Sequence, residues 1–364
     1  MTPGFQRVWL APVVAIAVLA GACGSSDDGG NDEAVASGGA AFRIPAVGVV
    51  DLGDCPDVWS NTTGVDGDEI RLGVSLPQSG PLATFGAIAD GMQDYFDHVN
   101  ETDPILDKEI VLVPRDDAYD AARTATNVEE MIETEDIFAF TFLLGSANNA
   151  AVRPILDEEC VPQLFNATGL PDWGDPANYP WTVGGLLAYT TEVDIWCDHA
   201  VSEVGEGATV AGLFVNNDFG IAYRRGLEAC VEEGRIDLVE NIVHEQGAAD
   251  ITNELTTLAA SGADVFVLGS TGAFCPQAIA GVDASPWEPL FLMSNPCASI
   301  GSFVTPVDPA GQGVRLACNN KEVTDAAFAD DPAVQEAIAI LEAAGRDPFG
   351  GSISTGVLFA QTVV

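Results

Sequence analysis

From residue 69 onward, this 364-residue chain predicts an α/β fold: two doubly wound parallel-sheet lobes around one cleft. Short apolar strand patterns alternate with helix patterns over most of this region, which is typical of parallel sheets covered by helices on both faces. A long segment rich in Pro, Gly, Asp and Trp, residues 167–185, interrupts the alternation once. The chain is also 47% hydrophobic, which is ample for two packed cores.

The first half alternates strands and helices with short links. Residues 70–76 alternate apolar and polar side chains, as a strand does. Residues 137–145 are apolar on both faces, which is typical of a buried parallel strand. The predicted strands are 70–76, 109–114, 137–145 and 161–166, and the predicted helices are 85–99, 121–134 and 148–159.

The second half repeats the rhythm after the interruption. Its predicted helices are 189–204, 221–234, 251–262, 276–283 and 332–346, and its predicted strands are 208–216, 236–244, 263–269, 289–295 and 313–319. The last residues, 355–364, begin an apolar helix pattern without a cap. We therefore expect the sequence to be truncated at its C-terminus.

The charge is strongly negative, with 13 Lys and Arg against 55 Asp and Glu and a formal net charge of −42. The acidic residues are scattered along the chain, which indicates a solvated acidic surface. Such a surface suits a salty or acid-rich setting, where screening weakens self-repulsion. A nucleic-acid partner is not expected, because binding phosphate groups requires a basic face.

The N-terminus has the pattern of a signal peptide over residues 1–22. Arg7 precedes an apolar run that ends in small residues and is too short to span a bilayer well. The sequence LAGAC at 19–23 resembles a bacterial lipobox, which implies a lipid on the sulfur of Cys23; a plain secretory signal is the alternative. Residues 23–68 are then a lipid-anchored tether and N-terminal extension, which implies a protein held at the outer face of a cell membrane.

Eight cysteines are typical of an oxidising compartment. None shows the closely spaced pairs of a zinc site, so we expect disulfides and neither a metal nor a cofactor. Cys197 and Cys230 lie on successive predicted helices that flank one strand, and Cys275 and Cys297 follow strand ends in adjacent units; these are the two predicted pairs. Without Cys23 the count is odd, which leaves at least one thiol free or paired outside the chain. The pairing stays open for Cys55, Cys160 and Cys318.

The turns that follow six of the strands are alike. They are PQSGP after 70–76, GSANN after 137–144, ATG after 161–166, NNDFG after 208–215, GSTG after 263–268 and SNPC after 289–293. Ligands bind outside the carboxyl ends of parallel strands, where small residues let a ligand approach free N–H groups at helix starts. Two facing lobes would put both sets of turns around one cleft. Ordinary turn and capping chemistry explains any single turn equally well.

Residues 69–364 resemble the periplasmic leucine/isoleucine/valine-binding protein family, the type I solute receptors of ABC transporters. The motifs that carry this resemblance are GVSLPQSGPLATFG, VPRDDAYDAARTATNVEEMIE, LLGSANNAAVRPILDEECVPQLFNATG, DPANYPWTVG and FVNNDFGIAYRRGLEAC. The resemblance implies two lobes joined by three crossovers, near 181–185, near 317–319 and beyond Val364. Lobe 1 would then be residues 69–184 plus 318–364, and lobe 2 residues 185–317.

The resemblance also implies a set of ligand-binding residues. They are Ser79, Phe85, Ser146, Ala147, Ala167, Thr168, Asp218, Phe219, Thr271 and Asn295. Among them, Ser146 with Ala147 and Ala167 with Thr168 match the family's ligand carboxylate site. Phe85 and Phe219 match aromatic walls, although each is also explained as an ordinary core residue.

Asn295 stands where amino-acid-binding members of the family place a carboxylate that pairs with the ligand's ammonium. An ammonium buried opposite an asparagine lacks its counter-charge, which is costly. Asp218 could supply one from another turn. A carboxylate or amide without the amine is therefore as good a candidate ligand as an amino acid.

The resemblance implies a monomeric receptor that binds a small polar solute and delivers it to an ABC transporter permease without turnover. A lipoprotein that senses ligand for a signalling partner, and less so a hydrolase, are the alternatives. A hydrolase needs a nucleophile beside a base. The three histidines, His98, His199 and His244, are predicted to lie away from the six turns, and no GxSxG, GxxxxGK[ST] or HExxH motif is present.

Overall fold

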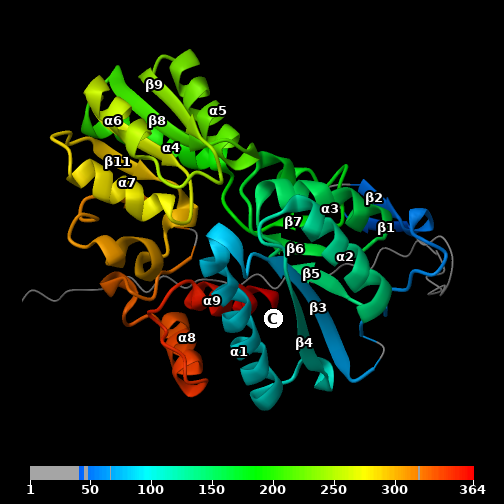
Figure 1. Ribbon diagram of the computed structural model, residues 1–364. Coiled ribbons are helices and arrows are strands. Elements are labelled where there is room, and N and C mark those ends of the chain that lie inside the picture. The colour runs from blue at the N-terminus through cyan, green and yellow to red at the C-terminus, as the bar shows by residue number, and fades with distance from the viewer. Residues whose placement is uncertain (1–40, 45–47, 66, 319) are drawn as a thin grey trace, which may run out of the picture. The chain divides into compact units, whose positions relative to one another are not determined.

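The computed structural model describes residues 41–44, 48–65, 67–318 and 320–364 (Figure 1). The expected signal peptide, Cys23 and the tether up to residue 40 lie outside the described residues. Ahead of the main fold, β1 (Ala41–Ile44) and β2 (Gly48–Asp51) pair as an antiparallel hairpin.

The first sheet contains five parallel strands in the order β4-β3-β5-β6-β7. They are β3 (Glu69–Leu76), β4 (Glu109–Asp116), β5 (Ala139–Thr141), β6 (Gln163–Asn166) and β7 (Thr182–Gly184). In register, Leu72 of β3 lies opposite Leu112 of β4 and Ala139 of β5. The carboxyl ends of these strands therefore meet at one edge of the sheet.

Helices cover both faces of the first sheet (Figure 1). On one face pack α2 (Ala121–Glu135) and α3 (Ser146–Glu158), whose Val128 and Val152 are fully buried. On the other face packs α1 (Ala87–Thr102), through Met92 and other apolar side chains. This two-sided burial explains the continuous apolar runs at residues 110–113 of β4 and around β5.

The second sheet is also parallel, with the order β12-β11-β10-β8-β9. Its strands are β8 (Ala208–Val215), β9 (Ile236–His244), β10 (Val265–Gly269), β11 (Leu290–Met293) and β12 (Arg315–Leu316). Its helices are α4 (Tyr189–Glu203), α5 (Asp218–Glu232), α6 (Thr252–Ser261) and α7 (Phe274–Asp283). Val193 of α4 and Leu227 of α5 belong to one apolar cluster of this sheet, and Leu258 of α6 and Ala278 of α7 to another. Helices therefore cover both faces here too.

Two predictions about the first sheet were wrong in detail. The sequence predicts that residues 182–184 belong to the crossover near 181–185. In the structure they form β7, which pairs with β6 and completes the sheet. The strand expected at 137–145 is cut to Ala139–Thr141, because Phe142 has φ 52° and leaves the extended conformation. Beyond that bend Leu144 makes only an isolated bridge to Ala167. Hydrophobicity alone does not report such a bend.

The C-terminal helices are α8 (Pro332–Ala343) and α9 (Ile353–Val363). Figure 1 shows α9 beside α1, although about 260 residues separate them in the sequence. The two helices approach closely through glycines, because a Cβ on Gly91 would overlap the carbonyl oxygen of Ile353 and one on Gly356 that of Ile88. Helix α9 therefore covers part of the same face of the first sheet as α1.

Three disulfides are present among the described residues. Cys197–Cys230 joins α4 to α5 and Cys275–Cys297 joins α7 to the turn after β11, the two pairs proposed from the sequence. The third links Cys55, which precedes β3, to Cys160 at the end of α3. Cys318 is free and exposed.

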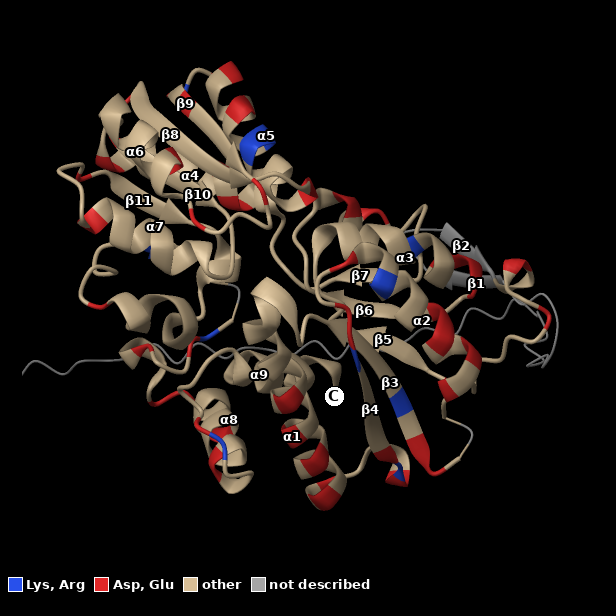
Figure 2. Ribbon diagram, viewed as in Figure 1, with Lys and Arg blue, Asp and Glu red and all other residues tan. Residues whose placement is uncertain are grey.

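Acidic residues are spread over the helices and loops around both sheets, and basic residues are few (Figure 2). Most of the described basic side chains form ion pairs, such as Arg71 with Glu135 and Arg346 with Asp94. None of the helices in the described ranges is long and apolar enough to cross a bilayer.

Candidate functional site

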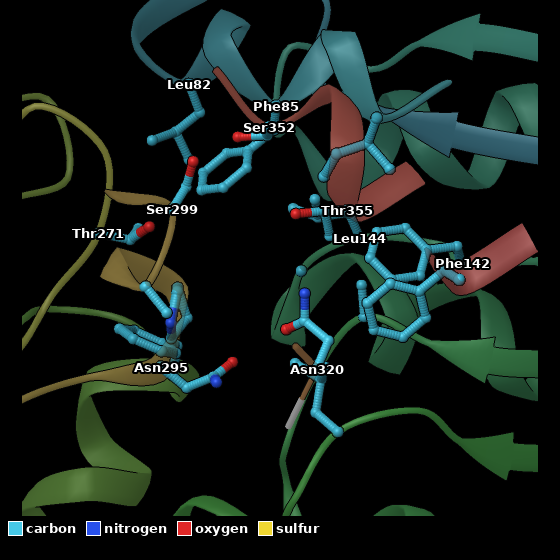
Figure 3. Close-up of a pocket in the computed structure, with 18 of the residues that line it drawn as sticks. Leu82, Phe85, Phe142, Leu144, Thr271, Asn295, Ser299, Asn320, Ser352 and Thr355 are labelled. Carbon is cyan, nitrogen blue, oxygen red and sulfur yellow. The ribbon is translucent and has the colours of Figure 1, made fainter. Parts of the chain in front are cut away.

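A cavity lies where the carboxyl-end turns of the first sheet face those of the second (Figure 3). Gly145 and Ala167 line it from the turns after β5 and β6, and Thr271 and Asn295 from the turns after β10 and β11. Its free volume is about 90 Å³. The turns of two separate sheets thus converge on one small space.

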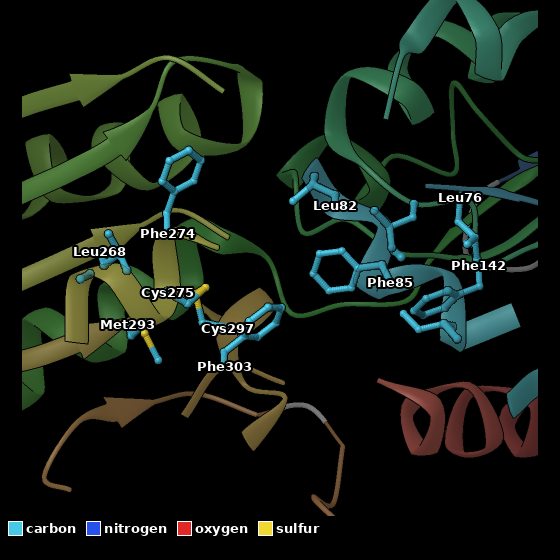
Figure 4. Packing of buried hydrophobic residues seen from close by; sticks show 14 of the residues in the cluster. Leu76, Leu82, Phe85, Phe142, Leu268, Phe274, Cys275, Met293, Cys297 and Phe303 are labelled. Atoms are coloured by element: carbon cyan, nitrogen blue, oxygen red, sulfur yellow. A yellow bond between two sulfur atoms is a disulfide. The ribbon is translucent and has the colours of Figure 1, made fainter. Parts of the chain in front are cut away.

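Apolar side chains form most of the cavity wall. They come from the turn before α1, from the segment after β5, from α4 and α5, and from α9, and include Leu82, Phe85, Phe142, Phe219 and Phe359. Figure 4 shows Phe85 and Phe303 within the apolar cluster that continues behind this wall, with ring centroids 5.8 Å apart. Phe85 belongs to the segment before α1 and Phe303 to the segment after β11, so an aromatic contact joins the two halves beside the cavity.

The turn GSANN is held by its own amides. Asn149 Nδ2 donates to the carbonyl oxygens of Leu143 and Gly145, each at 2.7 Å. Asn148 Nδ2 donates to Thr124 Oγ1 at 2.7 Å. Gly145 has φ 105°, which favours glycine, and a Cβ there would collide with the ring of Tyr119. These bonds fix the backbone that borders the cavity.

Ser146 and Thr168 lie one layer behind the cavity surface. Their hydroxyl oxygens are 2.8 Å apart, and both residues are almost completely buried. Neither they nor Ala147 line the cavity, whereas their neighbours Gly145 and Ala167 do. In this structure Ser146 and Thr168 therefore support the two turns, and of the residues matched to the carboxylate site Ala167 alone lines the cavity.

Five predicted site residues line the cavity together: Phe85, Ala167, Phe219, Thr271 and Asn295. Ser79 does not; it is exposed, and its hydroxyl donates to Asp116 Oδ2 at 2.5 Å. Asp218 does not either; it lines a separate hollow beside Arg153 and Arg225. Asp218 is therefore not the carboxylate that stands opposite Asn295.

Two hydroxyl groups in the cavity lining have no hydrogen-bond partner among the described residues: Thr271 Oγ1 and Ser352 Oγ. Both atoms are buried, and both side chains appear in Figure 3. A buried hydroxyl without a partner is costly unless something else satisfies it. These two groups are consequently ready to bond a ligand. Sequence reasoning missed Ser352, because only the packing of α9 on α1 brings it here.

Within the described part of the chain, Glu322 is the single charged side chain in the lining of this cavity, which contains no Lys or Arg. Burial raises the pKa of Glu322, while hydrogen bonds from Thr324 and from the backbone N–H of Ile300 lower it. The sequence predicted no role for this segment after β12, which carries no strand or helix pattern. Its carboxyl group is the nearest acid for any cationic part of a ligand.

A second carboxyl group lies directly beneath the cavity lining. Glu192 Oε1 accepts a hydrogen bond from the backbone N–H of Asn295 at 3.0 Å, and Oε2 accepts one from the hydroxyl of Tyr223 at 2.6 Å. Tyr189 lines the cavity and stacks on Tyr223, with ring centroids 4.7 Å apart. Burial raises the pKa of Glu192 to about 8, so this acid is largely protonated at neutral pH.

The prediction that His244 lies away from the six turns was wrong. His244 ends β9, and its Nε2 lies 2.8 Å from Ser270 Oγ in the turn after β10. The strand ends of a parallel sheet meet at one edge, so a histidine at the end of one strand reaches the turn of another. Burial lowers the pKa of His244, and its Nδ1 faces the backbone oxygen of Glu245 at 3.1 Å, not a carboxylate. Ser270 is fully buried.

Residues 69–350 match the periplasmic binding protein family model. Solved structures with a similar fold include a possible leucine/isoleucine/valine-binding protein from Rhodopirellula baltica SH 1, with 18% identity, a TM-score of 0.72 and coverage of 82% of this chain and 80% of that one. A branched-chain amino acid ABC transporter protein from Thermus thermophilus with bound valine has 20% identity, a TM-score of 0.72 and coverage of 81% and 76%.

A fatty acid ABC transporter substrate-binding protein from Thermomonospora curvata is also similar, with 19% identity, a TM-score of 0.69 and coverage of 82% and 76%. No curated protein matches the chain. These structures are named for different ligands, and their sequence identity to this chain is low. They therefore show the shared fold, and the ligand of this chain has to be inferred from its own residues.

Proposed function

The chain belongs to the periplasmic binding protein family, and from this premise we propose that it is an extracytoplasmic solute-binding lipoprotein of an ABC transporter. It captures a small polar ligand, namely an amino acid, a carboxylate or an amide, and delivers it to a membrane permease. The proposal includes a lipid anchor at Cys23 that holds a monomer at the outer face of the cell membrane. Binding, not chemical turnover, is its task.

The observation that carries this proposal is the pair of unpartnered hydroxyls inside a cavity bordered by both sheets. Thr271 Oγ1 comes from the second sheet, and Ser352 Oγ comes from the segment before α9, which packs with the first sheet. A ligand that bonds both would link the two halves of the fold. That geometry favours hinge closure around a ligand.

The size of the cavity also favours a hinge motion. A cavity of about 150 Å³ binds benzene, whereas the free volume here is only about 90 Å³. We therefore propose that lobe 1, residues 69–184 plus 318–364, moves away from lobe 2, residues 185–317, to admit the ligand. Within this proposal Glu322, not Asp218, is the carboxylate available to a ligand ammonium, while Asn295 offers amide chemistry.

The experiment is thermal unfolding of the full chain in high salt with matched ligand triplets: each amino acid, its deaminated acid and its amide. A ligand that binds the folded state raises the unfolding temperature by mass action. Losing one hydrogen bond weakens binding by roughly 1 kcal/mol, or about fivefold. We expect Thr271→Val and Ser352→Ala each to weaken the active ligand by about that factor.

Neither substitution should destabilise the free protein, because neither hydroxyl has an internal partner to lose. Thr256→Val, on the exposed side of α6, is the matched control and should leave binding unchanged. No shift with any triplet, or unchanged affinity in both cavity variants, would count against the proposal.

A further inference from the structure

A short extension ahead of the family-matched region forms a strap, residues 52–64, which is pinned to the first sheet at three points. The Cys55–Cys160 disulfide holds its beginning. Trp59 Nε1 donates to the backbone oxygen of Cys160 at 3.0 Å and holds its middle. At its end, the backbone oxygen of Gly64 accepts from the N–H of Arg71 at 3.0 Å. The strap is therefore a built part of the molecule.

Between the strap and the sheet lies a cavity of about 710 Å³, called here the strap cavity. Its other wall includes residues close to the start of three strands, namely Phe138 before β5, Val161 before β6 and Trp181 before β7. The cleft cavity lies at the opposite, carboxyl ends of the same strands. The two cavities are thus separate sites at opposite edges of the first sheet.

The strap cavity has the size of a ligand site. Pockets for small molecules typically measure about 300 to 1,000 Å³ and have mostly apolar walls. Protein interiors are otherwise packed with few voids larger than a water molecule. The strap is held by a disulfide and an indole hydrogen bond, and a space of this volume still remains between it and the sheet. This space is therefore available to a ligand. Val58 and Val183 in the lining are 90% and 46% exposed and add apolar surface.

The lining specifies the charge of the occupant. Trp59 and Trp181 meet edge to face with ring centroids 6.1 Å apart, and both line the cavity. Asp136 and Glu159 line it too, and neither forms an ion pair with a described residue. Among the residues that the structure describes, no Lys or Arg is part of the lining. Indole faces and free carboxylates attract a cation, and a net charge of −42 repels anions.

We propose that the strap cavity is a second binding site, which takes an organic cation with an apolar body of one or more aromatic rings. The indole rings contact the body and the cationic group, and Asp136 and Glu159 balance the charge. This site does not depend on the proposed function of the cleft cavity. The strap side of its lining lies outside the region that the family model matches, because the strap precedes residue 69.

The test is isothermal titration of the full chain with three probes of similar shape: benzyltrimethylammonium, benzyl alcohol and benzoate. We expect one equivalent of benzyltrimethylammonium to bind, and the alcohol and benzoate to bind at least tenfold more weakly. Trp181→Leu keeps an apolar wall without the indole and should weaken the cation by about tenfold. The double variant Asp136→Asn with Glu159→Gln should weaken it by a similar factor and remove its salt dependence.

Phe219→Leu alters the cleft cavity and should leave the titration unchanged. Trp59→Leu also removes the hydrogen bond to Cys160. Its titration is therefore interpreted only if its unfolding temperature matches that of the parent chain. No binding of the cation overturns the proposal, and so does equal binding of benzyl alcohol. Loss of binding in Phe219→Leu would place the cation in the cleft cavity and overturn it as well.

Discussion

Replacing Glu192 with glutamine should remove a pH dependence of folding that this buried acid creates. Burial raises the pKa of Glu192 from its ordinary 4.5 to about 8. Between these two pKa values the folded chain keeps the proton that the unfolded chain has released. The stabilisation that Glu192 contributes is therefore fully present below pH 4.5 and is lost as pH rises through 8. At about 1.36 kcal/mol per factor of ten in proton affinity, the loss between pH 5 and pH 8 is on the order of 3 to 4 kcal/mol.

Glutamine resembles the protonated acid in shape and hydrogen bonding. Its Oε1 can accept from the N–H of Asn295, and its Nε2 can donate to the hydroxyl oxygen of Tyr223, at the sites that the carboxyl oxygens of Glu192 now occupy. Glu192→Gln should thus match the parent chain near pH 5 and exceed its stability above pH 8. The control is Glu203→Gln, an exposed position near the end of the same helix.

The assay is urea unfolding at a series of pH values between 5 and 9, with the free energy of unfolding taken from each curve. The difference between Glu192→Gln and the Glu203→Gln control should grow in favour of the former as pH rises. Parallel pH profiles for the two variants would refute the assignment of a raised pKa to Glu192. A large destabilisation of Glu192→Gln at pH 5 would show instead that glutamine cannot replace the protonated acid.

Three further outcomes follow from packing and bonding. Replacing Cys197 and Cys230 together with serine opens a link of sequence separation 33 and should lower the unfolding free energy by about 3 to 4 kcal/mol, a difference that disappears under reduction. Gly356→Ala should cost about 1 to 3 kcal/mol, because its Cβ would overlap α1, whereas Gly174→Ala meets no atom and should be neutral in thermal unfolding. Asn149→Ala should cost about 2 to 3 kcal/mol in urea unfolding, because it removes the side-chain hydrogen bonds to the carbonyl oxygens of Leu143 and Gly145 and takes away the oxygen that accepts from the buried Nε2 of Gln163.

Much of the fold was predictable because its signals are local. Strands buried on both faces are apolar in almost every position, and helices with one buried face repeat at 3.6 residues. The alternation of the two patterns therefore predicted both parallel sheets and their helices. It failed at β7, whose three residues (Thr182–Gly184) lie among prolines and glycines and become a strand only by pairing with β6. It also overran β5, because a single residue with positive φ ends that strand.

Only those site residues that lie in the turn after a strand could be predicted from the sequence. Thr271 and Asn295 follow strands that share one sheet edge, so position in the pattern was enough to suggest them. Ser352 and Glu322 follow no strand, and they reach the cavity because the chain returns to the first sheet after β12. Glu192 sits on a helix, and nothing in its neighbours shows that it bonds a turn about 100 residues away.

The sequence by itself determined the elements, the acidic surface, the family resemblance and the turns that border a cleft, since each depends on residues close together in the chain. The tertiary structure decided which side chains meet. In the folded chain Ser146 and Thr168 lie behind the cavity surface, and Asp218 lines a separate hollow. Ser352 and Glu322 line the cavity, and a second cavity separates the strap from the first sheet. The reason is physical: a side chain's partners depend on how distant segments pack, and spacing along the chain carries no record of that distance.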